Sequence, residues 1–216
     1  MITKPQPFER SKHVYKNDEF VELVKDAVRF FNGTPVRELP PSESFTGTGV
    51  YAIYYTGKNG AYAKYGELNR TAYLYPIYVG KAVPKGWRQA RTADGSGSTS
   101  RELYSRLREH SRGIHAGSNI DLKDFMCRFM IFESGASDMI GSIEAALIKL
   151  NRPLWNTSLD GFGNHTPGKG RFEQAKSDWD VIHQGRAWAD KCKGIPKELK
   201  TVKANITRHL NSLDKK

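Results

Sequence analysis

The chain has 216 residues, and its 34 Lys or Arg against 23 Asp or Glu residues give a formal net charge of +11 and a pI near 9.6. A chain of this length forms one domain with insertions or at most two small ones, and 38% apolar residues can close a core. Two cysteines are too few for a disulfide framework or a zinc cluster. The positive excess favours a polyanionic partner, because contacts with phosphates release condensed counterions, although an ordinary basic protein has the same composition.

The N-terminal residues lack the apolar segment of a signal peptide. No apolar stretch reaches the length that spans a bilayer. We therefore expect a protein of the reducing cytoplasm, without a membrane partner.

The first 48 residues predict an arm, a helix and a loop. Residues 1–16 are polar and contain proline, as an extended arm does. Apolar residues recur at helical spacing over residues 20–31, where Asn17 can cap the helix and Gly33 can end it. Three prolines in residues 33–48 then predict a connecting loop.

Two strands follow, separated by a long polar stretch. Residues 50–56 are rich in β-branched and aromatic side chains, and a second run at 77–79 begins after Pro76, which suits an edge strand. The stretch 57–76 is too long for a tight hairpin and predicts an insertion, or extended strands with a functional loop. Residues 81–98 are basic and end in glycine and serine, which indicates an excursion from the sheet.

The next pair of elements is a helix and a strand. Thr99 and Glu102 have the spacing of a capping box, so we expect a helix to begin there and to stop near Gly113. Residues 125–132 are almost continuously apolar, which predicts a strand that is covered on both faces.

Another helix follows this strand, since Ser137 can cap an apolar stripe that Pro153 must end. Residues 161–170 are rich in glycine and predict a loop, and the rest of the chain is partly helical. The order strand, strand, helix, strand, helix predicts a mixed α+β layer structure.

Arg106 and His110 are the first candidates for chemistry. They lie four residues apart on one face of the predicted helix, beside a buried stripe that contains Leu103 and Leu107. The guanidinium can neutralise charge on a scissile phosphate, and the imidazole can orient water or move a proton. The alternative is an exposed arginine and a half-buried histidine on a solvated face.

The other candidates have structural alternatives too. Glu144 lies at the edge of the apolar face of the predicted helix 138–150, as a surface carboxylate or as a metal ligand. Magnesium needs few protein carboxylates, because it keeps waters and takes phosphate oxygens. The structural alternative for Tyr51 and Tyr78 is that they are strand tyrosines that only pack in the core. For Asn156 it is a loop residue whose side chain bonds its own backbone.

Two short segments place a tyrosine near a glycine in a strand-like run: Gly49-Val50-Tyr51 and Tyr78-Val79-Gly80. Together with the downstream candidates, in the order Arg106, His110, Glu144 and Asn156, they resemble the motifs of the GIY-YIG nuclease superfamily. The matched core runs from about residue 49 to residue 156. Valine replaces isoleucine in both motif halves, and the two tyrosines are farther apart than in the family's usual short hairpin.

The segment 177–189 is similar to a segment of type II restriction endonucleases in this superfamily, particularly those that cut GC-rich palindromes. His110 suits the same branch. The resemblance therefore implies sequence-specific hydrolysis of double-stranded DNA. A repair or homing nuclease of the superfamily, or a non-catalytic basic DNA-binding protein, remains an alternative.

The fold that the resemblance implies is α+β: a small, mostly antiparallel, three-stranded GIY-YIG-type sheet flanked by helices. We expect an N-terminal arm and helix in residues 1–48 and a catalytic core in residues 49–160, with insertions at 57–76 and 81–98. Residues 161–216 would form a C-terminal extension that packs on the core.

The resemblance implies six catalytic residues: Tyr51, Tyr78, Arg106, His110, Glu144 and Asn156. Glu144 would bind one Mg²⁺, or another hard divalent cation such as Mn²⁺, per active site. Tyr51 would act as general base or orient the attacking water, with Tyr78 and His110 tuning it. Arg106 would stabilise the transition state, and Asn156 would position phosphate or neighbouring groups. No small-molecule cofactor is expected.

A nuclease with one active site per chain needs two copies to cut both strands of a palindrome, so we expect a homodimer. Residues outside the core would contact the bases and phosphates. Our candidates for DNA binding are Arg70, Lys81, Arg88, Arg91, Lys169 and Arg171, although ordinary solvation explains each of them individually.

Overall fold

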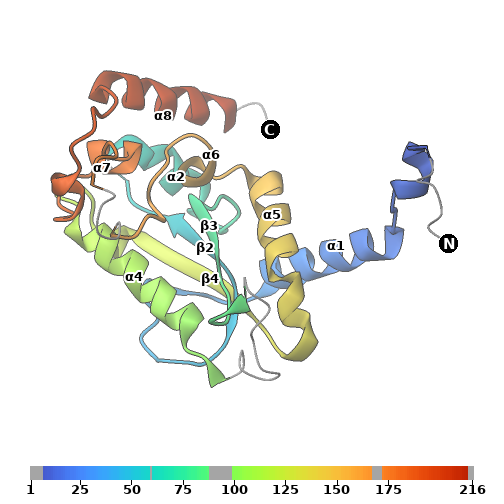
Figure 1. Cartoon of the computed structure of the whole chain (residues 1–216). Helices are drawn as coiled ribbons and strands as arrows, with labels where there is room; N and C mark the ends of the chain where they lie inside the picture. Colours follow the sequence, from blue (N-terminus) through green and yellow to red (C-terminus); the bar gives the residue numbers. More distant parts are fainter. Residues whose placement is uncertain (1–6, 59, 88–98, 167–171, 214–216) are drawn as a thin grey trace.

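The computed structural model describes the chain except for residues 1–6, 59, 88–98, 167–171 and 214–216 (Figure 1). Its centre is a four-stranded antiparallel sheet with the order β1-β4-β2-β3. The strands are β1 (Val36–Glu38), β2 (Thr48–Tyr55), β3 (Tyr78–Ala82) and β4 (Phe125–Phe132). The predicted α+β class is confirmed, and so are the three strands expected from the sequence.

The predicted count of three strands is wrong, because β1 forms inside the stretch expected to be a loop. Val36 pairs with Arg128 and Glu38 with Met126, so β1 covers the edge of β4. Strand β1 has only three residues, which is too short for an alternating pattern to show in the sequence. The strand forms because its backbone pairs with that of β4, and this long-range pairing cannot be read from the local sequence.

Helices cover both faces of the sheet (Figure 1). On one face lie α1 (Asp18–Gly33) and α5 (Ile140–Asn151). On the other lie α2 (Ala63–Leu68), α4 (Glu102–Ala116), α6 (Leu154–Thr157), α7 (Asp178–Ile182) and α8 (Leu199–Leu213). The described residues also contain short 3-10 helices: η1 (Arg10–His13), η2 (Gly60–Tyr62), η4 (Leu122–Asp124), η5 (Ser134–Met139) and η6 (Ala189–Lys191).

Strand β2 is buried along its whole length because it lies between these two layers. Its side chains alternate between the layers, as the period of a strand requires. Val50, Ala52 and Tyr54 pack toward α1 and α5, whereas Tyr51, Ile53 and Tyr55 pack toward α4 and the C-terminal helices. The two faces of β2 therefore belong to two different apolar clusters.

The helix ends show which capping predictions were correct. The Asn17 side chain accepts a hydrogen bond from the backbone of Phe20 at 2.8 Å, so the predicted cap of α1 is confirmed. Thr99 does not cap α4: the hydroxyl of Ser100 accepts from Glu102 instead. The helix also continues past Gly113 to Ala116. A single glycine inside a helix weakens it without ending it.

The prediction for the following helix needs the same correction at its start. Ser137 lies inside η5 rather than at an N-cap, and α5 begins at Ile140. Its end agrees with the sequence, since Asn151 is its last residue and Pro153 follows closely. Arg152 takes a left-handed conformation there.

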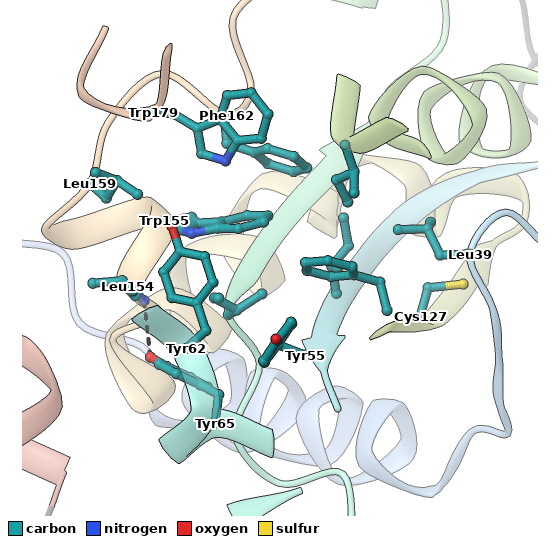
Figure 2. Close-up of a cluster of buried hydrophobic side chains, with 14 of the residues drawn as sticks. Leu39, Tyr55, Tyr62, Tyr65, Cys127, Leu154, Trp155, Leu159, Phe162 and Trp179 are labelled. Carbon is teal, nitrogen blue, oxygen red and sulfur yellow. Dashed lines mark hydrogen bonds between the residues drawn. The ribbon is translucent and has the colours of Figure 1, made fainter. Parts of the chain in front are cut away.

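The stretch 57–76 does not form extended strands. It contains η2 and α2, whose Tyr62 and Tyr65 are buried in the cluster beside α6 (Figure 2). The Tyr65 hydroxyl accepts a hydrogen bond from the backbone of Leu154. The polar composition of this stretch did not predict these helical segments, in which Tyr62 and Tyr65 bury their rings. Of the predicted excursion 81–98, residues 88–98 lie outside the described part of the chain.

The C-terminal residues share the core with the sheet. Trp179 of α7 and Val202 of α8 belong to the same cluster as Tyr51 and Leu107. Within the described residues, none of the helices has the length and apolar character needed to cross a membrane.

Gly49 provides a test of how β2 and β4 pair. A Cβ atom at this position would lie 1.9 Å from the backbone oxygen of Met130, so Gly49→Ala must push the two strands apart. We expect the free energy of unfolding, measured with urea, to fall by about 2–4 kcal/mol.

Gly113→Ala is the matched control, because an added Cβ meets no atom within 4 Å there and alanine favours the helix. That variant should gain about 0.5–1 kcal/mol. Equal stability of the two variants would contradict the strand pairing described above.

Candidate active site

Five of the six residues proposed from the sequence come from four elements: Tyr51 on β2, Tyr78 on β3, Arg106 and His110 on α4, and Glu144 on α5. Residues far apart in the sequence thus approach each other through the packing of α4 and α5 on β2 and β3. The contacts between them are described below.

Tyr51 and His110 form a buried hydrogen bond, with 2.6 Å between the phenol oxygen and Nε2. Burial raises the pKa of Tyr51 well above its ordinary value, with Tyr78 adding to the rise and Arg106 opposing it. Burial also lowers the pKa of His110 well below 6.5, and the positive charge of Arg106 lowers it further. At neutral pH the bond therefore joins a protonated phenol to a neutral imidazole.

Gly80 makes room for this pair. It is the register partner of Tyr51 on β3, and a Cβ there would lie 2.4 Å from the Tyr51 oxygen. The glycine of the second motif half therefore has a steric role: it lets the Tyr51 ring lie flat across the neighbouring strand.

Tyr78 lies beside the pair and closer to solvent. Its ring centre is 6.3 Å from that of Tyr51 and 5.2 Å from that of His110. Burial is the main cause that raises the pKa of Tyr78, while Arg106 lowers this pKa and Glu144 raises it. Because Arg106 and Glu144 act on both phenols, the cation and the carboxylate lie within electrostatic range of the same two hydroxyl groups.

Arg106 is held by partners that the sequence did not reveal. One guanidinium nitrogen donates to Glu109 at 2.7 Å, and another donates to the backbone oxygen of Gly163 at 3.0 Å. His165 contacts both Arg106 and Glu109. The three-residue spacing of Arg106 and Glu109 is a local signal for this ion pair, whereas nothing in the sequence links His165 to them.

Glu144 is paired with Lys81, whose Nζ lies 2.6 Å from Oε2. Their side chains keep 18% and 31% of their surface exposed, respectively. No cluster of three potential metal-ligating side chains occurs among the described residues. The site nevertheless fits a hard divalent cation, because such an ion needs few protein carboxylates. The carboxylate of Glu144 already binds one cation, the ammonium of Lys81.

Asn156 of α6 bonds to the backbone of β3. Its amide accepts from the backbone nitrogen of Val79 and donates to the backbone oxygen of Val79, both at 2.8 Å. These two bonds cover part of the outer edge of β3, where no further strand pairs among the described residues. The side chain therefore holds the strand that carries Tyr78 instead of bonding its own backbone, and its expected role in positioning phosphate or neighbouring groups stays a prediction.

The C-terminal extension supports the site through Arg186. Its guanidinium forms a buried ion pair with Asp180, at 2.6 and 2.7 Å, and donates to the backbone oxygens of Gly161 and Phe162. The Phe162 ring stacks on His110 with 4.6 Å between ring centres. Arg186 lies in the segment 177–189 that carried the resemblance, but its role is visible only in the folded chain.

The residues proposed to bind DNA are only partly placed. Arg70 is exposed after α2, and Lys81 lies in the site itself. The other four, Arg88, Arg91, Lys169 and Arg171, lie outside the described residues.

The buried histidines predict how stability depends on pH. Burial lowers the pKa of His110 and lowers that of His183 to about 3, with Arg186 adding to both effects. Above pH 6.5 neither the folded nor the unfolded chain protonates these side chains. Below it only the unfolded chain does, so each histidine lowers the free energy of unfolding by up to about 1.4 kcal/mol per pH unit.

Urea denaturation at pH 7.5, 6.5 and 5.5 measures this slope. His110→Gln, whose amide can still accept from Tyr51, should reduce the slope, and replacement of the exposed His115 by Gln is the control. An unfolding free energy that does not change over this range would contradict the neutral, buried state of His110.

Comparison with known families matches residues 43–210 to the model of the Eco29kI GIY-YIG domain. The match covers well over half of the chain and includes every residue of the site described above. Comparison with curated proteins gives no match. The chain therefore belongs to the Eco29kI GIY-YIG domain family, a type II restriction endonuclease family of the GIY-YIG nucleases.

Proposed function

We propose that this protein is a type II restriction endonuclease that hydrolyses double-stranded DNA at a short, GC-rich palindrome with the help of a divalent metal ion. Family membership implies a DNA endonuclease. The observation that carries the proposal is the buried hydrogen bond between Tyr51 and His110, which lies within the electrostatic influence of Arg106. Such a site has a proton acceptor and a cation, with a carboxylate in electrostatic range of the same phenols.

The Tyr51–His110 pair supplies the proton chemistry of the proposal. A neutral imidazole can accept a proton, and its Nε2 lies within hydrogen-bonding distance of the phenol. Tyr51 orients the attacking water or takes its proton, and it passes its own proton to His110. Because the pKa of Tyr51 is raised by burial, the phenol needs such an acceptor to act as a base.

Arg106 and Glu144 supply the charges. Arg106 is prearranged by Glu109 and by the backbone of Gly163, so it stabilises charge that develops on the phosphate without a large reorganisation. Glu144 would hold a metal ion, Mg²⁺ or Mn²⁺, and the bound ion would supply Lewis-acid chemistry at the phosphate. Tyr78 is closer to solvent than Tyr51 and tunes it.

The substrate and the assembly follow from charge and symmetry. A formal net charge of +11 suits a polyanion such as DNA. One active site per chain requires two copies to cut both strands of a palindrome, which supports a homodimer. The domain division that goes with this proposal is an N-terminal arm and helix (1–48), a catalytic core (49–160) and a C-terminal extension (161–216).

Incubation with plasmid DNA and Mg²⁺ tests the proposed activity. We expect discrete linear fragments, because a dimer that reads a palindrome cuts both strands at fixed positions. Nicks or cuts that depend on DNA structure would instead indicate a repair or homing nuclease. A gel shift without cleavage would indicate a binding protein.

Glu144→Gln is the matched variant in this assay. It should still bind DNA but cut at least about 100-fold more slowly, because the metal ion loses its carboxylate. Undiminished cleavage by this variant would remove Glu144 from the mechanism.

Tyr51→Phe tests the proton chemistry, since it removes the hydroxyl that bonds to His110. We expect the single-turnover rate to fall by about 10²- to 10⁴-fold while DNA binding is retained. Tyr54→Phe is the control, because Tyr54 is also buried in β2 but packs on the opposite face. Equal rates for the two variants would refute the role of Tyr51.

A further inference from the structure

We propose that Lys81 is a positioning residue that occupies the cation-binding position of Glu144 in the DNA-free protein and moves to a substrate phosphate when a divalent ion binds. The inference rests on the proposed function, because it takes Glu144 as the ligand of the metal ion. It assigns to Lys81 a role beyond that of an ordinary phosphate contact.

The strand geometry brings Lys81 to Glu144. Side chains two residues apart on a strand point to the same face, so Lys81 lies on the face of β3 that Val79 shares. Val79 packs in the cluster formed with α1 and α5. Since Glu144 is on α5, the packing of this helix on β3 places the carboxylate within 2.6 Å of the ammonium.

The charge of Glu144 explains why the free protein needs a cation here. The carboxylate is largely buried, with 18% of its side chain exposed, and it lies close enough to Tyr51 and Tyr78 to raise the pKa of each. A largely buried carboxylate without a partner is unfavourable. Arg106 is already held by Glu109, so Lys81 is the side chain that neutralises Glu144.

Lys81 is also able to leave. Its ammonium is a point charge on a flexible stem, and 31% of its side chain is exposed, so it can turn toward solvent without disrupting the core. A divalent ion bound to the same carboxylate would repel the ammonium at this distance. When Lys81 leaves the carboxylate of Glu144, a DNA phosphate close to the site offers it another negatively charged partner.

Two consequences follow for binding. In the DNA-free protein Lys81 competes with the metal ion, so the affinity for the metal is lower than Glu144 alone would give. DNA removes this competition, so metal and DNA strengthen each other's binding by the same factor. A lysine that only contacted phosphate would leave the metal affinity of the DNA-free protein unchanged.

The test is the affinity of the DNA-free protein for Mn²⁺, measured by electron paramagnetic resonance on the full chain. Lys81→Met and Lys81→Gln should each bind Mn²⁺ about threefold to tenfold more tightly than wild type, as expected for the loss of a partly exposed competing charge. Lys85→Met is the matched control: it removes a positive charge from the same segment, but Lys85 faces Glu102 rather than Glu144.

Each outcome decides a different question. Mn²⁺ affinity in both Lys81 variants that equals or falls below that of wild type overturns the inference. An equal increase in Lys85→Met overturns it too, because a general change in charge would then explain the result. Glu144→Gln separates this from the proposed function: if it binds Mn²⁺ as wild type does, Glu144 is not the ligand and the metal part of the proposed function fails.

Discussion

The buried hydrogen bond between Tyr51 and His110 is the interaction on which the rest of the site depends. It joins the central strand β2 to α4 with 2.6 Å between the two polar atoms, and it gives both buried side chains a hydrogen-bond partner away from bulk solvent. Two further buried tyrosines of this layer also form a hydrogen bond with a histidine: Tyr62 with His183 and Tyr65 with His209. Burial lowers the pKa of His110 and of His183, so these two imidazoles bring no charge into the core at neutral pH.

The pair needs support from the C-terminal part of the chain. Phe162 stacks on His110, and the backbone oxygen of Phe162 is held by Arg186. The adjacent residue, Gly163, offers its own backbone oxygen to Arg106. A single buried ion pair between Arg186 and Asp180 therefore fixes a loop that contacts both the imidazole and the guanidinium. This connection gives a physical reason why the family match continues beyond the motif residues, to residue 210.

The candidate site includes residues of β3, an edge strand of the sheet. Strand β1 is one edge of the sheet, and the amide of Asn156 covers part of the other edge, β3. With β3 held in this way, its two faces present different chemistry: Tyr78 lies toward α4, and Lys81 lies toward α5. The proton chemistry and the metal chemistry of the proposed mechanism thus come from opposite faces of one strand.

The sequence by itself determined the motif residues, the α+β class, the three longer strands and helix α1 with its cap, because these depend on local periodicity and on residues a few positions apart. It did not reveal β1 or α2, whose short segments acquire their structure from the neighbours they pack against. Only the tertiary structure decided the partners of the site: Lys81 for Glu144, Gly163 for Arg106 and the backbone of Val79 for Asn156. These contacts join residues more than fifty positions apart, and such distances close only when both faces of the sheet are packed.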